Sequence, residues 1–302
     1  MRERFVAAWD RFWHTPADPR VAAGLRIGVG VIVFLAFLFQ APYATTWWGE
    51  DGLLPSRVAR RLLDPDAGSV LLLLPPDDLW LWACFGLAMV QALLLAVGWH
   101  SHVQAACLFV WLVSFQHRNQ LVIDGEDAVM RLITFFLIFA PISERWSLDA
   151  LRGRTPRIRS GWALRMIQIQ VTFVFLAAGL EKLPGSMWRD GTALYHIFLL
   201  DDFYPRFALP EVIAGNLWVS RLMSWGTLAL EVAVPIGVWI PRTRALAVAA
   251  AIFFHLALDL LMNLYFFEWI MIVGWLSFVR WDEDLPWLGR WAAPAASPAT
   301  AD

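Results

Sequence analysis

Long apolar segments separated by short polar stretches make up most of this 302-residue chain. An α-helix needs roughly 20 predominantly apolar residues to cross the hydrocarbon core of a bilayer, and eight segments approach that length. The pattern therefore predicts an all-α polytopic membrane bundle with about eight transmembrane helices. The predicted helices cover residues 21–40, 79–97, 102–116, 128–142, 162–180, 217–240, 244–261 and 264–280.

The two ends of the chain differ from this apolar middle. Near the N-terminus, Phe5, Trp9, Phe12 and Trp13 recur at helical spacing among charged residues, which is typical of an amphipathic helix in the membrane interface. Residues 1–20 are therefore predicted to form an interfacial helix, and residues 21–281 a transmembrane domain. Residues 282–302 are polar and then rich in Ala and Pro, which predicts a short disordered tail.

Composition supports lipid as the main solvent of the chain. Hydrophobic residues make up 59% of it and charged residues 17%, whereas soluble domains are typically about 45–50% apolar and about 25% charged. The formal net charge of -2 gives no reason to expect a nucleic-acid partner.

Arginine is more frequent in the segments on the side of the N-terminus, notably in residues 145–159, than in those on the other side. Basic residues favour cytoplasmic loops. We therefore expect both termini in the cytoplasm and the protein in the inner membrane of a bacterium. Two longer connections, residues 41–78 and 181–216, would then fold over the outer face of the bundle.

Several ionisable residues lie inside the predicted helices, where they are costly and tend to face the interior of a bundle. Glu231 has apolar neighbours on both sides, and His255 and Asp259 are four residues apart and so share a helix face. These three residues predict a polar cavity. The alternative is that Glu231 pairs with His255 or Arg131 and only fixes the packing. Such a trio could also hold a metal, but a single His without a closely spaced motif argues against that, and no metal is expected.

Lys182 is the only lysine among the 24 basic residues. It lies at the end of a predicted helix, where any cation is favoured by the helix dipole. An arginine would serve that purpose equally well. Unlike a guanidinium, however, a buried lysine amine can give up its proton and act as a base. Both interpretations are open on the sequence alone.

From the fourth predicted helix (residues 128–142) onward, and more weakly before it, the sequence resembles the membrane portion of the vitamin K-dependent gamma-glutamyl carboxylase and, more widely, the HTTM (horizontally transferred transmembrane) domain family. The resemblance rests on the order of several short stretches. They are Arg-Trp-Ser-Leu-Asp at 145–149, Ala-Gly-Leu-Glu-Lys-Leu at 178–183, Trp-Arg-Asp-Gly at 188–191, Glu231, and Phe-His at 254–255. Glu181 stands where the carboxylase has the first of two lysines, and Gly125-Glu126 where it has Asn-His.

The resemblance implies that Lys182 is a general base for a reduced, vitamin K-like quinone in an outward-opening pocket. Together with the ionisable residues of the predicted helices, this gives Lys182, His255 and Glu231 as candidate catalytic residues, and Trp188, Gly191, Tyr195, Arg131, Gln168 and Asp259 as candidate substrate-binding residues. The expected partners are membrane lipid, a quinone or other amphipathic small molecule and a peptide substrate.

Two functions therefore compete. The first is a carboxylase-like membrane enzyme, a lyase or oxidoreductase with a lysine base. The second is a non-catalytic membrane factor that binds lipid or assists maturation or immunity, as suggested by relatives of sporulation-delaying protein B. Transport is disfavoured because the sequence has no internal repeat with interrupted helices.

Overall fold

The computed structural model describes residues 2–63, 67–155, 160–200, 205–207 and 215–284. Over these residues the chain is all-α and has no β-strand, apart from an isolated bridge between Pro205 and Met262. The predicted disordered tail covers residues 282–302. Its first three residues instead belong to a short helix, α17 (Trp281–Asp284), and residues 285–302 lie outside the described part of the chain.

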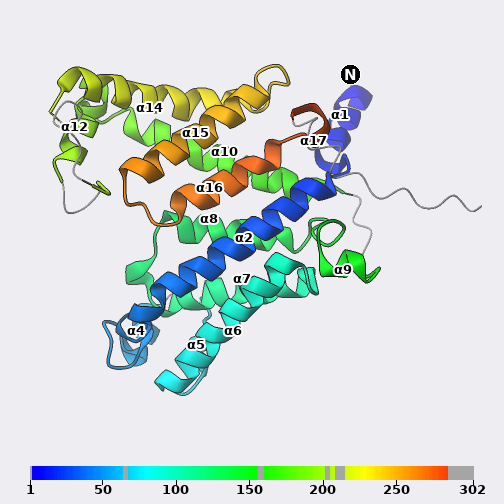
Figure 1. Cartoon of the computed structure of the whole chain (residues 1–302), viewed down its shortest axis with the longest axis vertical. Coiled ribbons are helices and arrows are strands. Elements are labelled where there is room, and N and C mark those ends of the chain that lie inside the picture. The colour runs from blue at the N-terminus through cyan, green and yellow to red at the C-terminus, as the bar shows by residue number, and fades with distance from the viewer. Residues whose placement is uncertain (1, 64–66, 156–159, 201–204, 208–214, 285–302) are drawn as a thin grey trace, which may run out of the picture.

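Eight helices, one in each predicted apolar segment, form two groups of four that pack against each other (Figure 1). The first group consists of α2 (Pro19–Gln40), α6 (Asp78–Val97), α7 (Ser101–Arg118) and α8 (Gly125–Leu137). The second consists of α10 (Trp162–Lys182), α14 (Leu217–Gly237), α15 (Arg244–Leu261) and α16 (Phe267–Trp275). Contacts of α16 with α2 and of α8 with α10 join the groups.

Short helices connect these eight. They are η1 (Ala41–Tyr43), α3 (Ala44–Trp48), α4 (Ser56–Leu62), α5 (Val70–Leu73), η2 (Gln120–Val122), α9 (Leu148–Leu151), α11 (Ser186–Asp190), α12 (Ala193–Phe198) and η3 (Leu276–Phe278). The segments before α6 and before α14 carry most of them, as the length of the two predicted outer connections suggested.

Each of the eight predicted segments contains a helix, but the structure does not clearly give eight transmembrane helices. Only four helices of the described chain are long and apolar enough to cross a membrane: Pro19–Trp48, Asp78–Val97, Trp162–Lys182 and Arg244–Leu261. The apolar helix Phe267–Phe278 is shorter. The remaining segments contain more polar residues or break earlier, because apolar length in the sequence does not by itself give a straight helix of that length.

The outward surfaces of the long helices are apolar. Leu222, Leu246 and Phe253 are more than 70% exposed, and similar side chains recur along α2, α6 and α7. A water-soluble protein rarely exposes such a continuous apolar surface. Hydrocarbon is therefore the solvent that this surface fits.

The turn between α6 and α7 shows why the Trp-Ser-Leu-Asp motif is needed for the fold. Asp149 accepts hydrogen bonds from the backbone N–H groups of His100 and Ser101, both at 2.8 Å, and so caps α7. Gly98 has φ +74°, and a Cβ there would lie 2.4 Å from the Arg26 guanidinium. Arg26 is fully buried and donates to the carbonyls of Leu95, Ala96 and Trp146. Together with Arg26, the motif therefore connects the first part of α2, the end of α6 and the start of α7.

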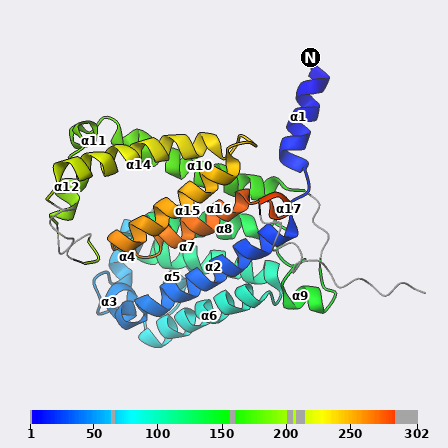
Figure 2. The same ribbon diagram turned by 45° about the horizontal axis from the view of Figure 1, so that its top comes forward.

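Helix α1 (Arg2–His14) projects from the bundle (Figure 2). Its aromatic side chains form a row in which Phe5 stacks on Trp9 and Trp9 meets Trp13 edge-on. Phe5 and Trp9 are 67% and 55% exposed. The helix is present as predicted, and its position in the membrane interface stays a prediction.

Candidate functional site

A cavity of about 300 Å³ lies among α10, α14, α15 and α16 and is bordered by α11 and α12. Its walls are mostly apolar, with Phe175, Phe254 and Phe267 among them. Its polar side chains are Lys182, Glu231, His255 and Glu268, with Thr227. A mainly apolar cavity with a few convergent polar groups is the usual form of a small-molecule site. We call it the Lys182 cavity.

Lys182 and Glu231 form an ion pair in this cavity. The Lys182 Nζ lies 2.6 Å from Glu231 Oε1 and also donates to the Ala178 carbonyl at 3.3 Å. The Lys182 side chain is 26% exposed and that of Glu231 5%. The Trp188 ring lies 5.4 Å from Nζ and so gives the cation a second, cation–π contact. The amine is held from three sides.

Two sequence features bring the pair together. At Gly179 a Cβ would lie 2.9 Å from the Glu231 Cβ, so only glycine permits this approach of α10 to α14. Pro235, one turn after Glu231, has no backbone N–H and therefore leaves the Glu231 carbonyl without its helical partner. Glu231 thus sits at a weakened point of α14, directly opposite a glycine.

His255 is the centre of a buried array. Its Nδ1 bonds to the Glu268 carboxylate, and the Trp275 Nε1–H donates to His255 Nε2 at 3.1 Å. Because an indole nitrogen can only donate, Nε2 must be the acceptor and the proton must be on Nδ1. His255 is therefore neutral and has both nitrogens engaged. All three side chains are at most 1% exposed.

Two carboxylate oxygens of the site lack a partner. Glu231 Oε2 and Glu268 Oε1 are buried and have no hydrogen bond among the described residues. Leaving a buried acceptor unsatisfied costs about 1–3 kcal/mol, and more for a charged group. A ligand that carries hydrogen-bond donors would satisfy both oxygens.

The structure brings together some of the residues singled out in the sequence and separates others. Lys182, Glu231, His255 and Trp188 line the cavity. Asp259 instead pairs with Arg206 at 2.9 Å, outside the lining, so the hypothetical metal trio is not assembled.

The other predicted substrate-binding residues also lie outside the lining. Gly191, with φ +78°, ends α11, and its carbonyl accepts from the Ser220 hydroxyl. The Tyr195 N–H donates to the same hydroxyl. Arg131 is half-buried on α8. Gln168 belongs to a second cavity, near the start of α10.

Glu268 lines the cavity but was not singled out as a site residue. It follows two phenylalanines at the start of an apolar segment, where a carboxylate is easily interpreted as interfacial. Its complete burial gives it a different role. The available signal was a carboxylate with an apolar neighbour on each side, the same pattern that identifies Glu231.

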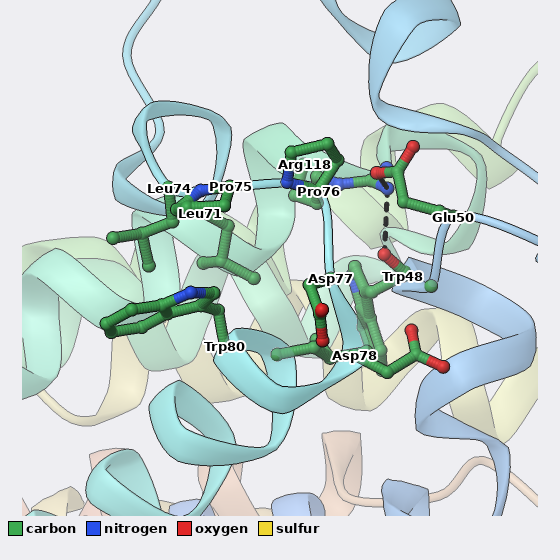
Figure 3. Close-up of a pocket in the computed structure, with 12 residues that line it drawn as sticks. Trp48, Glu50, Leu71, Leu74, Pro75, Pro76, Asp77, Asp78, Trp80 and Arg118 are labelled. Atoms are coloured by element: carbon green, nitrogen blue, oxygen red, sulfur yellow. Dashed lines mark hydrogen bonds and ion pairs between the residues drawn. The ribbon is translucent and has the colours of Figure 1, made fainter.

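A smaller recess of about 30 Å³ lies by the connection between α2 and α6 (Figure 3). Arg118 is buried there and donates to the carbonyls of Leu54 and Trp48, with Glu50 beside it at 3.4 Å. Its hydrogen bonds hold the loop onto α7. The recess is therefore well explained as a structural joint.

Glu126 lies in the first turn of α8, close to Phe266. Burial, together with the neighbouring charges of Asp127 and Asp124, raises the pKa of Glu126 to about 8. Asp127 does not pair with Arg131 but accepts from the Asp124 N–H, which completes a capping box. Glu126 therefore holds its proton more strongly than an ordinary carboxyl, and it does not line the cavity.

Comparison with known proteins agrees with this architecture. The HTTM domain model matches residues 16–282. The uncharacterized protein YitO of Bacillus subtilis is 24% identical over 64% of each chain. The sporulation-delaying protein SdpB of the same organism is 27% identical over 39% of this chain and 37% of its own length. The chain thus covers less than two thirds of either relative, and no solved structure matches. The match and the four long apolar helices indicate a membrane protein.

Proposed function

This chain belongs to the HTTM domain family, and from that premise we propose that it is a membrane enzyme with Lys182 as its general base. Its substrate would be a quinol or another amphipathic molecule bound in the Lys182 cavity. The observation that carries the proposal is the Lys182–Glu231 pair, with its 2.6 Å contact, in a mostly apolar chamber.

The membrane setting is part of the proposal. The other four helices, α7, α8, α14 and α16, which are either shorter or less apolar, would complete an eight-helix bundle around the four candidate membrane spans. With arginine-rich segments in the cytoplasm, both termini would lie inside and the Lys182 end of α10 would face outward. The inner membrane of a bacterium is the proposed location.

The chemistry begins with the removal of water. An ion pair is costly in a dry site unless all its atoms are satisfied, and Glu231 Oε2 is not. When an apolar substrate fills the cavity, transfer of one proton from Nζ to the Glu231 carboxylate leaves an amine and a carboxylic acid, both uncharged. The short contact between them suits this transfer.

The amine then acts on the substrate. Its lone pair accepts the proton of a substrate hydroxyl, the O–H bond breaks, and the electron pair remains on the substrate oxygen. The cation that re-forms at Lys182 stabilises that oxygen, as expected of a base in a low-dielectric site. Trp188 holds the cation from its other side.

The residues of the cavity fit a quinol. Its volume of about 300 Å³ is at the lower end of ligand sites. Phe175, Phe254 and Phe267 offer apolar surface to a ring, and the free oxygens of Glu231 and Glu268 can accept from two hydroxyls. His255, held neutral, would orient Glu268 as a positioning residue.

The experiment begins with the full chain purified in mild detergent. Molecules that co-purify are extracted and identified by mass spectrometry, and turnover of an added reduced naphthoquinol is followed optically. We expect a bound quinone or similar amphipath. Lys182→Arg should retain it but lose turnover by about 10²–10⁴-fold, the usual contribution of a general base.

Arg189→Lys is the matched control, because Arg189 is exposed on the neighbouring α11. It should turn over normally. If Lys182→Arg keeps full turnover, the base role is excluded. If the purified protein turns over no quinol but Lys182→Arg still weakens binding of an amphipath, the non-catalytic membrane factor is favoured, in line with the similarity to the sporulation-delaying protein SdpB.

A further inference from the structure

A second cavity, of about 370 Å³, lies at the other end of the same four helices. The start of α10, the end of α14, the start of α15 and the segment after α16 enclose it, together with residues 15–18 before α2. Its lining includes three arginines, Arg165, Arg244 and Arg280. We call it the arginine cavity.

Arg165 carries a charge that no described carboxylate neutralises. Its Nε donates to the Phe12 carbonyl at 3.1 Å and its Nη1 to Gln168 Oε1 at 2.6 Å. The guanidinium lies 4.5 Å from the Phe12 ring and 5.5 Å from the Trp239 ring. These contacts fix its plane, and its Nη2 has no hydrogen bond among the described residues. The Arg165 guanidinium is therefore held in a fixed orientation, and its Nη2 N–H groups can donate hydrogen bonds to a ligand.

Other donors of this cavity are also unused. Arg244 is 6% exposed, and its Nε is buried without a partner in the described part of the chain. The Ser277 hydroxyl, in a residue that is 4% exposed, is likewise unpartnered. Buried unsatisfied donors are uncommon in folded proteins. Here they come from two separate elements and line one chamber.

The lining holds two carboxylates, Asp18 and Glu283, against its three arginines. Asp18 is already paired with Arg20, which also binds Asp282. Glu283 pairs with Arg244 at 2.9 Å and with Arg280 at 3.0 Å, but its side chain is 59% exposed. Asp284, which is not in the lining, also lies 3.4 Å from Arg244. Glu283 is therefore a carboxylate at the solvent side of the cavity. Its pairing shows that an anionic group fits between Arg244 and Arg280.

We propose that the arginine cavity binds a phosphate group, carried by an anionic membrane lipid. Arginine presents planar N–H pairs that suit phosphate oxygens. Leu164, Val238 and Phe278 add apolar walls beside the charged groups, which suits a headgroup followed by acyl chains. Basic recesses between membrane helices bind anionic headgroups in this way.

Native mass spectrometry of the full chain tests this, with phosphatidylglycerol, phosphatidylcholine or inorganic phosphate added in separate arms. We expect phosphatidylglycerol to bind and phosphatidylcholine to bind at least about tenfold more weakly. Arg165→Gln should weaken phosphatidylglycerol binding about tenfold, since a hydrogen bond to a charged group contributes about that much. Arg242→Gln, which removes an exposed charge two residues before Arg244, should leave it unchanged.

Glu283→Gln gives a test in the opposite direction. It removes an exposed competitor and should tighten phosphatidylglycerol binding, an effect that loss of folding cannot imitate. If Arg165→Gln and Arg242→Gln bind alike, the proposal is wrong. If inorganic phosphate displaces the lipid at equal concentration, the phosphate site is upheld and its ligand is the free ion.

Discussion

The Lys182 cavity and the arginine cavity are built from the same four helices, yet they have opposite electrostatic character. Lys182 and Arg165 are 17 residues apart on α10, which places the two cavities about 25 Å apart along the helix. At the Lys182 end, two carboxylate oxygens lack partners, and at the Arg165 end arginine and hydroxyl donors lack them. One bundle thus prefers a hydrogen-bond donor at one end and an anion at the other.

The two ends also differ in how their charges are neutralised. Glu231 and Glu268 are at most 4% exposed, and their partners lie on neighbouring long helices. Glu283 and Asp282 belong to the short α17 and are largely exposed. Loss of a partner should therefore be costly at the Lys182 end and mild at the other. This difference suits the two proposed roles. A catalytic site needs side chains held in fixed positions, whereas a lipid-binding site must be open to the lipid.

The largest expected effect is on stability when the Lys182–Glu231 pair is broken. Glu231→Ala leaves Lys182 without its carboxylate and should lower the free energy of unfolding by about 3 kcal/mol, the lower part of the range for buried pairs, because Lys182 keeps 26% exposure. Thermal unfolding in detergent, followed by tryptophan fluorescence, measures it.

The double variant Lys182→Met with Glu231→Leu is the control, since apolar replacement of a whole buried pair is often neutral. It should recover most of the lost stability. Glu283→Ala at the other end should shift the unfolding midpoint much less, because Asp284, 3.4 Å from the Arg244 guanidinium, keeps this buried arginine paired. If Glu231→Ala and Glu283→Ala lower the stability equally, the two cavities do not differ in how strongly their ion pairs stabilise the fold.

A second, smaller effect concerns the contact between α10 and α14. Gly179→Ala places a Cβ 2.9 Å from the Glu231 Cβ and should cost about 1–3 kcal/mol, because packed helix backbones must move apart. The shift would also separate Lys182 from Glu231, so substrate binding should weaken along with stability.

Gly226→Ala is the matched control on α14, because its Cβ would meet nothing within 4 Å. Alanine is the better helix former by about 1 kcal/mol, so this variant should be neutral or slightly stabilising. A Gly179→Ala variant as stable as Gly226→Ala would show that the close approach does not constrain the pair.

Much of this architecture could be predicted from the sequence. The eight helical segments follow from apolar runs, and Lys182 and Glu231 stand out because they are rare residue types for their surroundings. The sequence does not reveal in which direction a side chain points from its helix. Asp259 is four residues after His255, yet a helix turns by 400° over that interval. The remaining 40°, near the end of α15, takes Asp259 away from the cavity to Arg206.

The arginine cavity was harder to foresee than the Lys182 cavity. Arginine is abundant in this chain, so Arg165 and Arg244 are unremarkable in the sequence. Their convergence depends on how α10, α15 and the segment after α16 meet, which no local pattern contains. Gln168 was associated with the Lys182 site, but it bonds to Arg165 and to the Ser277 carbonyl at the opposite end.

The smallest expected effect uses pH to separate the two ends. Burial and two neighbouring acids raise the pKa of Glu126 to about 8, whereas hydrogen bonds from Arg244 and Arg280 lower the pKa of Glu283. A raised carboxyl pKa means that the folded state holds a proton that the unfolded state has lost. Stability from Glu126 is thus full below the ordinary carboxyl pKa and declines as pH rises towards 8.

For Glu283 the change of stability with pH has the opposite sign. Its pairing stabilises the fold above the ordinary carboxyl pKa and is lost only as pH falls through the lowered value. Between pH 6 and 8 the decline should therefore come from Glu126 alone of these two. It should amount to about 1 kcal/mol, because partial exposure screens the charge. Glu126→Gln should remove most of the pH dependence of the thermal unfolding midpoint between pH 6 and 8, and Glu283→Gln should not. A decline that persists in Glu126→Gln would place its origin elsewhere, because glutamine keeps the size of the side chain and removes its titration.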